Sequence, residues 1–343
     1  MKKIVNTHKI EYFDSRIFDT YFKDKSMVVF DIESMGLNPK YNEVVLAAFM
    51  DVKPNGEATV TQYLLDSMDE EPLLVSTIYD VLNSYDMMLT YNGRHFDIPF
   101  IKTRAQVLGI RDINPDWNDI VPYDLDLYLV LHGHSSLKKI LPNLKQKSIE
   151  EYMGLATSRD DEISGAESVV LFKEYLSTLD MDYRESLANK ILLHNHDDVV
   201  QLYKLLPIIK KTNFHQAMTK LGFPAYSSNT IKCDISYIKL SGNELQITGT
   251  HNRDGYSYIS FASEDRPYEV EFKKDFSFEI TIPTKKMDVH DIVNIRTMGL
   301  NDGVFNKLGG YVNGFIILAS NSTLNALEAN LLARELVSSI LDE

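Results

Sequence analysis

Three short acidic segments hold the side chains best suited to chemistry. Asp31 ends the apolar run MVVFD and Glu33 follows two residues later, so on a strand both carboxylates would point to one face. Asp97 ends the segment NGRHFD, and His194 and Asp198 are spaced to share one face of a helix. Carboxylate oxygens suit Mg²⁺ or Mn²⁺, so the four acids predict a site of two divalent ions for hydrolysing phosphodiesters.

Each segment also has a purely structural interpretation. The pattern Asp-x-Glu begins at residues 31, 69 and 160 of this acidic chain, and only the first copy ends an apolar strand. Asp31 and Glu33 could be a solvated pair at a strand end. Asp97 could simply start a helix, and His194 with Asp198 could be a structural pair. Their order, on successive strand ends and one late helix, favours a shared site. We expect His196 and Asp197 to be solvated. Asp124 and Asp126 could support the metal ligands, but we favour a simple strand-edge role for them.

Hydrophobic patterning predicts the elements that position these residues. Apolar runs indicate strands, and the turn Lys53-Pro54-Asn55-Gly56 indicates a hairpin. The order βββαβαβαα predicts an α/β fold with a mixed five-stranded sheet flanked by helices. The expected strands are 27–31, 43–52, 58–65, 87–91 and 121–129, and the expected helices are about 70–83, 96–108, 164–178 and 183–206.

The composition changes after about residue 210. Strand-like alternation dominates from Ile231 onward, and the chain closes with an apolar stripe typical of an amphipathic helix. This pattern predicts a smaller β-rich domain closed by a terminal helix. The expected organisation is an N-terminal arm at 1–26, a main domain at 27–210, a linker at 211–230 and an accessory domain at 231–343.

Net charge argues against a broad, non-specific binder of nucleic acid. The formal charge is −14, whereas such binders depend on many Lys and Arg contacts to phosphate. Residues 127–149 nevertheless contain no Asp or Glu, which makes Lys138 and Lys139 candidate phosphate contacts. The alternative is a solvated basic face. With one cysteine, no signal-peptide pattern and no apolar run of about 20 residues, we expect a cytoplasmic protein without membrane contact.

The same motifs resemble those of a known family. VVFDIESMGL resembles the first motif of DEDD-type exonucleases, often FDIETTGL, and NGRHFD resembles the second, Asn-x-x-x-Phe-Asp. HNHDD occupies the place of the third, usually Tyr-Asn-x-x-Asp, and residues 159–167 are similar to a further signature. Residues 25–210 therefore resemble the YprB-like branch of the ribonuclease H-like superfamily.

This resemblance implies a function and roles for individual residues. Asp31, Glu33 and Asp198 would bind one divalent ion, and Asp97 would hold a second ion that Asp31 bridges. His194 would orient or deprotonate the attacking water. The implied activity is 3′→5′ exonuclease cleavage of single-stranded DNA or RNA ends with Mg²⁺ or Mn²⁺. Besides Lys138 and Lys139 of the acid-free stretch, Asn92 is a candidate substrate contact.

One residue departs from the family pattern. DEDD enzymes carry Tyr-x3-Asp or His-x4-Asp, whereas His194-x3-Asp198 places a histidine in the tyrosine position. Its role as a base is therefore open, and other functions remain as alternatives. These are an inactive nucleic-acid-binding or scaffold protein, a structure-specific endonuclease, and a β-rich domain that recruits a protein partner.

Overall fold

The structure is a computed structural model that describes residues 1–110, 122–155, 163, 165–228 and 231–342. The chain forms two compact units: residues 1–19 with 23–212, and residues 20–22 with 213–343. This division differs from the predicted one. The expected N-terminal arm contains strand β1 (Lys2–Lys9) and helix α1 (Arg16–Phe22), and β1 and most of α1 belong to the first unit. The expected linker contains helix α8 (Phe214–Leu221), which belongs to the second unit.

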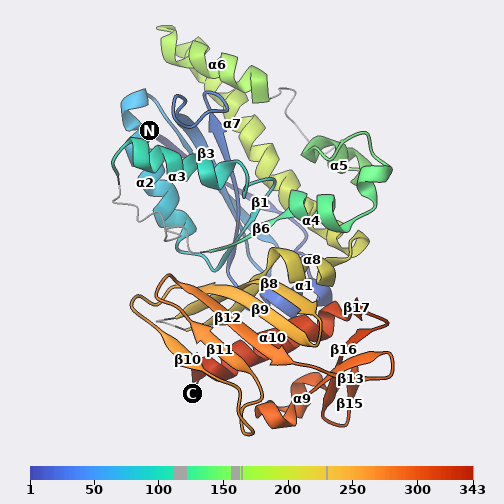
Figure 1. Ribbon diagram of the computed structural model, residues 1–343. Coiled ribbons are helices and arrows are strands. Elements are labelled where there is room, and N and C mark those ends of the chain that lie inside the picture. The colour runs from blue at the N-terminus through green and yellow to red at the C-terminus, as the bar shows by residue number, and fades with distance from the viewer. Residues whose placement is uncertain (111–121, 156–162, 164, 229–230, 343) are drawn as a thin grey trace. The chain divides into compact units, whose positions relative to one another are not determined.

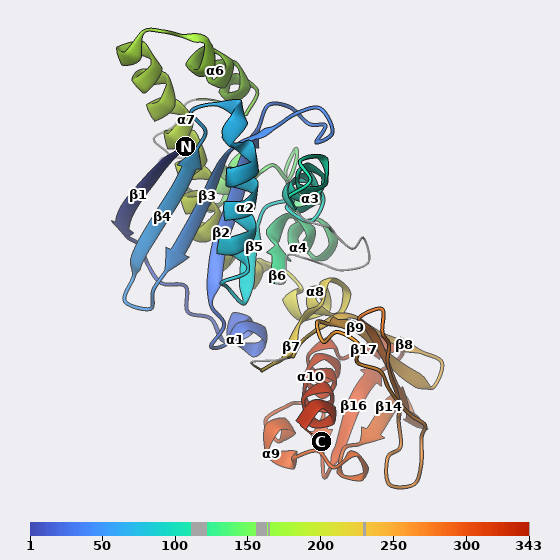
Figure 2. The ribbon, with the colours of Figure 1, turned by 90° about the vertical axis from the view of Figure 1, so that its left-hand side faces the viewer.

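The first unit is built on a mixed sheet with strand order β1-β4-β3-β2-β5-β6 (Figure 2). Strand β5 pairs in parallel with both β2 and β6, and the other pairs are antiparallel. The mixed α/β sheet is confirmed, but it has six strands rather than five because β1 adds to the edge of β4. The remaining strands are β2 (Met27–Ser34), β3 (Val44–Val52), β4 (Glu57–Leu64), β5 (Met87–Thr90) and β6 (Tyr123–Asp126).

Helices cover both faces of this sheet. The long helix α7 (Met181–Lys204) packs across β2 and β3 on one face, and α2 (Glu71–Leu82) packs on the other (Figures 1 and 2). Val28, Val29 and Phe30 of β2 are consequently all buried. The other helices are α3 (Asp97–Val107), α4 (Leu127–His134), α5 (Gln146–Met153) and α6 (Gly165–Ser177), with 3₁₀ turns at Met68–Glu70, Leu137–Lys139 and Leu206–Lys211.

The predicted strand at 121–129 is wrong in its second half. The described part of that strand ends at Asp126, and α4 begins at Leu127. The Asp126 carboxylate accepts a 3.2 Å hydrogen bond from the backbone N–H of Leu129, which caps the helix. Leu127, Val130 and Leu131 are buried at helical spacing. The alternating Asp and Leu residues therefore continue as a helix, not as a strand.

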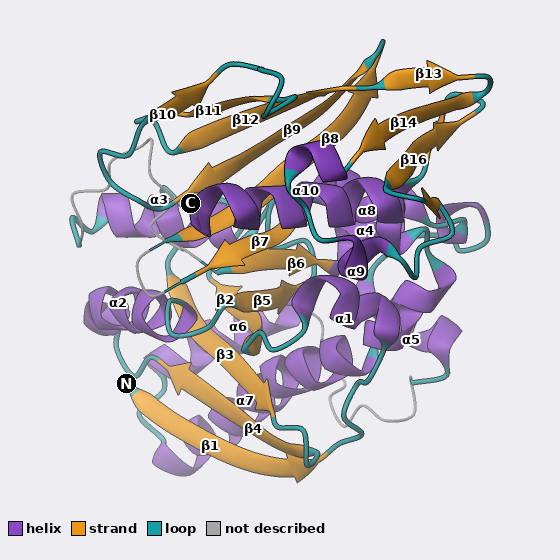
Figure 3. Cartoon of the chain, turned by 90° about the horizontal axis from the view of Figure 1, so that it is seen from below, coloured by secondary structure: helices purple, strands orange, loops and turns teal. Residues whose placement is uncertain are grey.

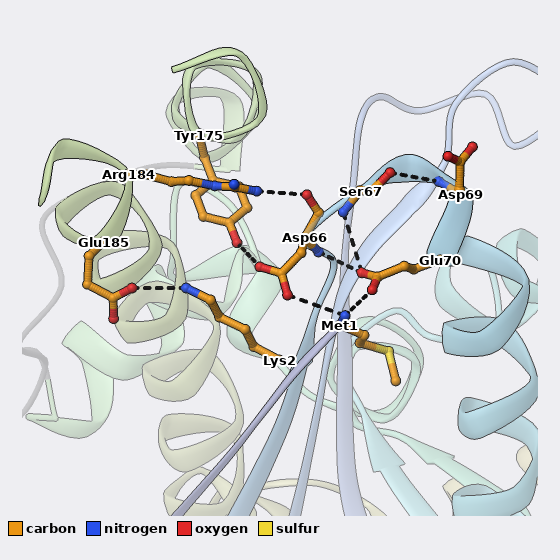
Figure 4. Close-up of polar contacts among 9 residues, drawn as sticks. All are labelled: Met1, Lys2, Asp66, Ser67, Asp69, Glu70, Tyr175, Arg184 and Glu185. Carbon is orange, nitrogen blue, oxygen red and sulfur yellow. Dashed lines mark hydrogen bonds and ion pairs between the residues drawn. The ribbon is translucent and has the colours of Figure 1, made fainter. Parts of the chain in front are cut away.

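Polar contacts fasten β1 to its surroundings (Figure 4). The Met1 ammonium pairs with Glu70 and lies 3.3 Å from the Asp66 carboxylate. Asp66 also accepts a 2.6 Å hydrogen bond from the Tyr175 hydroxyl, and Lys2 pairs with Glu185 on α7 at 2.9 Å. Strand β1 is thus held by the sheet and by helix α7.

A buried ion pair links helices α2 and α3. Two guanidinium nitrogens of Arg104 donate to the Glu71 carboxylate at 2.8 and 2.6 Å. Glu71 also accepts the Val44 N–H at 2.9 Å, and Arg104 donates to the Pro39 carbonyl at 3.0 Å. The pair therefore holds the segment between β2 and β3, which directly follows the first acidic motif.

The second unit is β-rich and ends in a helix, as expected. Its two sheets have strand orders β10-β11-β12-β9-β8-β7 and β13-β14-β16-β15, and β17 pairs with β16. Helix α10 (Ala326–Asp342) packs on β7 and β8 beside α8 (Figure 3), and Leu332, Leu336 and Ile340 are buried.

The described strands of this unit pair in antiparallel fashion. They are β7 (Phe223–Ser227), β8 (Lys232–Ser241), β9 (Glu244–His251), β10 (Tyr258–Ser260), β11 (Glu269–Phe272), β12 (Ser277–Pro283), β13 (Lys285–Met287), β14 (His290–Asn294), β15 (Tyr311–Val312), β16 (Phe315–Ser320) and β17 (Thr323–Leu324), with helix α9 (Asp302–Phe305) and a 3₁₀ turn at Arg296–Met298. Among the described residues, no helix is long and apolar enough to cross a membrane.

Candidate metal-dependent active site

The first two acidic motifs meet at the end of strand β2. Asp31 and Glu33 lie near the C-terminal end of strand β2, which continues to Ser34. Asp97 is the first residue of α3, as predicted, and is only 5% exposed. Its carboxylate accepts a 3.4 Å hydrogen bond from the N–H of Ile32, the residue between Asp31 and Glu33. The strand end and the helix start are therefore in direct contact.

Asp126 fixes the turn that leads to Asp97. Its carboxylate accepts the N–H groups of Asn92 at 2.9 Å and Arg94 at 3.2 Å, and Asn92 adopts a left-handed φ of 66°. Asp124 is buried, and its carboxylate accepts the Thr90 hydroxyl at 2.7 Å. Asp126 therefore supports the second motif directly and does more than end an edge strand, whereas the Asp124 carboxylate binds Thr90, just before that motif.

Helix α7 brings the third motif to the same place. The Nε2 atom of His194 lies 3.6 Å from Glu33 Oε1 and 3.6 Å from Asp198 Oδ2. One ligand atom from each of these three side chains lies within 4.8 Å of the others, so together they could hold a metal ion. His194 is buried, whereas the Asp198 side chain is 21% exposed. The site thus reaches solvent on the side of Asp198.

Asn195 contributes a contact that the sequence analysis missed. Its side-chain amide donates a 2.9 Å hydrogen bond to Asp31 Oδ2. Gln62 on β4 in turn donates to Asn195 Oδ1 at 3.0 Å and to the Leu192 carbonyl at 2.9 Å. Asn195 matches the Asn of the Tyr-Asn-x-x-Asp motif, and this match was the signal that could have identified it. The chain of amides orients the Asp31 carboxylate.

Electrostatics at the site favour a bound cation. Burial raises the pKa of Asp31 well above its ordinary value, and the charges of Asp97, Asp198 and Glu33 add to the rise. Burial also raises the pKa of Glu33 to about 7, against the opposing effect of His194. The pKa of Asp97 is likewise raised to about 7, mainly by burial. Clustered buried carboxylates repel one another, and a divalent ion would relieve that repulsion.

The neighbours of Asp198 on α7 are less exposed than predicted. Asp197 is 4% exposed, and its carboxylate lies 3.2 Å from Nδ1 of His196. The Nε2 atom of His196 lies 2.7 Å from Nε2 of His8 on β1. The expectation that both residues are solvated is therefore wrong, because β1 and the sheet cover this face of α7.

A groove of about 480 Å³ adjoins the acidic site. It is linked to the site by Gln146, whose side-chain amide donates to the Asp198 carbonyl at 2.9 Å. Lys138 and Lys139 are exposed on a 3₁₀ turn and do not line it. The lining residues are Tyr91, Asn92, Tyr128, Asn143, Leu144, Lys145 and Gln146.

Part of the further signature at 159–167 lies outside the described residues, as does the start of the predicted strand at residue 121. Within that signature, Glu167 is exposed. The neighbouring Ser168 is buried, and its hydroxyl hydrogen-bonds to Glu33 and opposes the rise of the Glu33 pKa.

Comparisons with known proteins found similarity to DNA polymerases and to an uncharacterized bacterial protein. A DNA polymerase of Methanocaldococcus jannaschii is 33% identical over 94 residues, which cover 25% of this chain and 6% of the polymerase. The uncharacterized protein YprB of Bacillus subtilis is 26% identical over 186 residues, covering 54% of this chain and 42% of YprB. Among solved structures, a family B DNA polymerase from Pyrobaculum calidifontis aligns with a TM-score of 0.41 and 18% identity, over 57% of this chain and 26% of the polymerase.

The chain spans less than half the length of each of these relatives. The family model of the RNase_H superfamily matches residues 28–209, more than half of the chain, and the protein therefore belongs to that superfamily.

Proposed function

We propose that this protein is a divalent-metal-dependent 3′→5′ exonuclease that removes nucleotides from single-stranded ends of DNA or RNA. One observation carries the proposal. Asp31, Glu33, Asp97 and Asp198 converge from a strand end, a helix start and a late helix in the unit that matches the RNase_H superfamily. Convergent carboxylates are what a phosphodiesterase needs to bind divalent ions beside a phosphate.

The donor set fits Mg²⁺ or Mn²⁺. Asp31, Glu33, Asp97 and Asp198 offer hard carboxylate oxygens, and burial raises the pKa of each of the first three. We propose that they hold two ions, with Asp31 shared. When bound, such ions would activate water and stabilise the leaving 3′ oxygen.

The remaining residues of the site act on these carboxylates or on the substrate. Asn195 orients Asp31 through its 2.9 Å hydrogen bond, and Ser168 hydrogen-bonds to Glu33. The turn held by Asp126 keeps Asp97 against Ile32. These contacts hold the metal-binding oxygens in place before an ion arrives, which lowers the cost of assembling the site.

The groove beside Asp198 is the proposed path of the substrate strand. Tyr128 and Tyr91 are partly exposed in it, with ring centroids 5.9 Å apart, and Lys145 is exposed at its rim. Aromatic rings stack on bases of any sequence, and a lysine can contact phosphate. The groove therefore suits a single strand better than a duplex.

The test compares the wild-type chain with two matched aspartate variants. Each protein is incubated with Mn²⁺ and single-stranded oligonucleotides labelled at the 5′ end. We expect a ladder of shortened products for the wild type and for Asp69→Ala, and loss of activity for Asp31→Ala. Asp69 begins another Asp-x-Glu sequence but is exposed and lies outside the site. Cleavage that is equal in all three proteins, or absent from all of them, would contradict the proposal.

Substrate topology separates the proposed exonuclease from an endonuclease with the same chemistry. A circular single strand has no end, so it should resist the wild-type protein while the linear form is degraded. Cleavage of the circle at a comparable rate would assign endonuclease activity instead. A 3′-terminal phosphorothioate linkage should slow the exonuclease at its first step, which checks the direction of attack.

A further inference from the structure

The position of His194 is the main feature of the site that the usual arrangement of acids does not explain. Its Nε2 atom lies 3.6 Å from an oxygen of Glu33 and 3.6 Å from an oxygen of Asp198. Both distances exceed the range of about 2.7–3.2 Å for a normal hydrogen bond. The imidazole nitrogen therefore faces both carboxylates at distances longer than those of a direct hydrogen bond.

This spacing fits three ligands of one metal ion. Metal–ligand bonds of about 2.0–2.2 Å place two ligand atoms about 3.0 Å apart at a right angle and about 3.5 Å apart at a tetrahedral angle. The two distances of 3.6 Å lie just beyond this range, so a small side-chain rotation would suffice. All three ligand atoms lie within 4.8 Å of one another.

The backbone supports the same interpretation. His194 and Asp198 are four residues apart on α7 and share one helical face, and the histidine ring is almost fully buried at 5% exposure. A general base has to reach the attacking water, whereas this nitrogen points to two carboxylates that are themselves proposed ligands. An ion bound by Glu33 and Asp198 would lie within bonding reach of Nε2.

We infer that His194 is a direct ligand of the metal ion held by Glu33 and Asp198, and that the site consequently prefers a first-row transition ion such as Mn²⁺ to Mg²⁺. Mg²⁺ takes oxygen ligands almost exclusively, whereas imidazole nitrogen is a good ligand for transition ions. This inference deepens the proposed function, since it names a ligand and an ion preference for the same site.

The test detects nitrogen bound to the metal without measuring activity. The full chain is stripped of metal and loaded with less than one equivalent of Mn²⁺, and electron spin echo envelope modulation is recorded. We expect modulation from a directly bound ¹⁴N nucleus in the wild type and its loss in His194→Gln. His196→Gln is the matched control, because His196 lies on the same helix but contacts His8 and Asp197 instead.

Binding measurements add a second readout. Calorimetric titration should show that His194→Gln binds Mn²⁺ at least about tenfold more weakly, while Mg²⁺ binding changes by less than about threefold. Circular dichroism and thermal melting verify that each variant folds; if His194→Gln does not, His194→Asn replaces it. A wild-type spectrum without nitrogen modulation would overturn the inference, as would modulation that persists in the folded variant.

The outcomes separate this inference from the proposed function. If the wild type degrades oligonucleotides and Asp31→Ala does not, but no nitrogen is bound to the metal, the nuclease stands and the ligand role of His194 fails. If nitrogen is bound and no oligonucleotide is degraded under any divalent ion, the ligand role stands and the proposed nuclease fails.

Discussion

The side-chain amide of Asn195 donates a 2.9 Å hydrogen bond to the carboxylate of Asp31, which ties helix α7 to the end of strand β2. Asn195 is fully buried and is itself held by Gln62 on β4 at 3.0 Å. The hydrogen bond also opposes the rise of the Asp31 pKa. Asn195 is therefore a positioning residue whose loss should affect metal binding more than folding.

Replacing Asn195 with alanine should weaken metal binding. Without the amide, the Asp31 carboxylate loses its orientation and a partner that favours its charged form, so we expect the metal affinity or the nuclease rate to fall about 10–100-fold. Gln62→Leu acts one contact further away and should have a smaller effect. Calorimetric titration with Mn²⁺ measures both variants. A variant Asn195→Ala with wild-type affinity would show that this contact is only structural.

Stability of the metal-free protein should decrease as the pH rises. Burial raises the pKa of Glu33 and of Asp97 to about 7, whereas ordinary values are about 4. Between these values the folded state binds more protons than the unfolded state, so the free energy of unfolding falls with increasing pH. Thermal melts in EDTA from pH 5 to pH 8 measure this slope.

Two controls test the origin of that pH dependence. Asp97→Asn removes one of the titrating groups. The loss in the free energy of unfolding between pH 5 and pH 8 should therefore be smaller by about 1–3 kcal/mol, whereas Asp69→Ala should leave that loss unchanged. Metal binding needs deprotonated carboxylates, so the stabilisation by Mn²⁺ should be larger at pH 8 than at pH 5. A metal-free protein that becomes more stable toward pH 8 would contradict the raised pKa values.

Breaking the buried Arg104–Glu71 pair should destabilise the first unit. Arg104→Met leaves a carboxylate that is 3% exposed without its charged partner, which typically costs about 3–5 kcal/mol. Urea denaturation measures this loss. The double variant Arg104→Met with Glu71→Leu should recover part of it, because no uncompensated buried charge remains. Equal stability of the wild type and Arg104→Met would show that the pair contributes nothing.

Lysines inside and outside the groove should differ in their effect on substrate binding. Lys145→Ala and Tyr128→Ala remove a phosphate contact and a stacking surface, and we expect each to weaken binding of a single-stranded oligonucleotide about 3–30-fold. Lys138→Ala with Lys139→Ala removes two charges that do not line the groove, so binding should change little. Fluorescence anisotropy in Ca²⁺ measures binding without cleavage. The reverse order of effects would place the strand along Lys138 and Lys139.

Local spacing in the sequence determined the acidic pattern and the main elements. The spacing of two residues was enough to predict that Asp31 and Glu33 share one face of a strand. The spacing of four residues was enough to predict that His194 and Asp198 share one face of a helix. Strands β2 to β5 and helices α2, α3, α6 and α7 follow the predicted ranges closely, because apolar runs and the turn residues between them mark these elements in the sequence.

Elements whose stability comes from distant partners were predicted poorly. Strand β1 has mostly exposed side chains and forms through backbone pairing with β4, so it leaves little hydrophobic signal. The segment after Asp126 alternates like a strand, but a side-chain cap and buried leucines make it a helix. Asp197 is buried and His196 is partly buried, and His196 contacts His8 on β1, a partner far away in the sequence.

The assembly of the site was decided by tertiary structure alone. Sequence spacing could place Glu33, His194 and Asp198 on their elements, but only the packing of α7 against β2 brings the histidine 3.6 Å from both carboxylates. The same packing selects Asn195, rather than another polar residue of α7, to hold Asp31. Distances between side chains on different elements depend on how those elements pack, and no local period in the sequence specifies that packing.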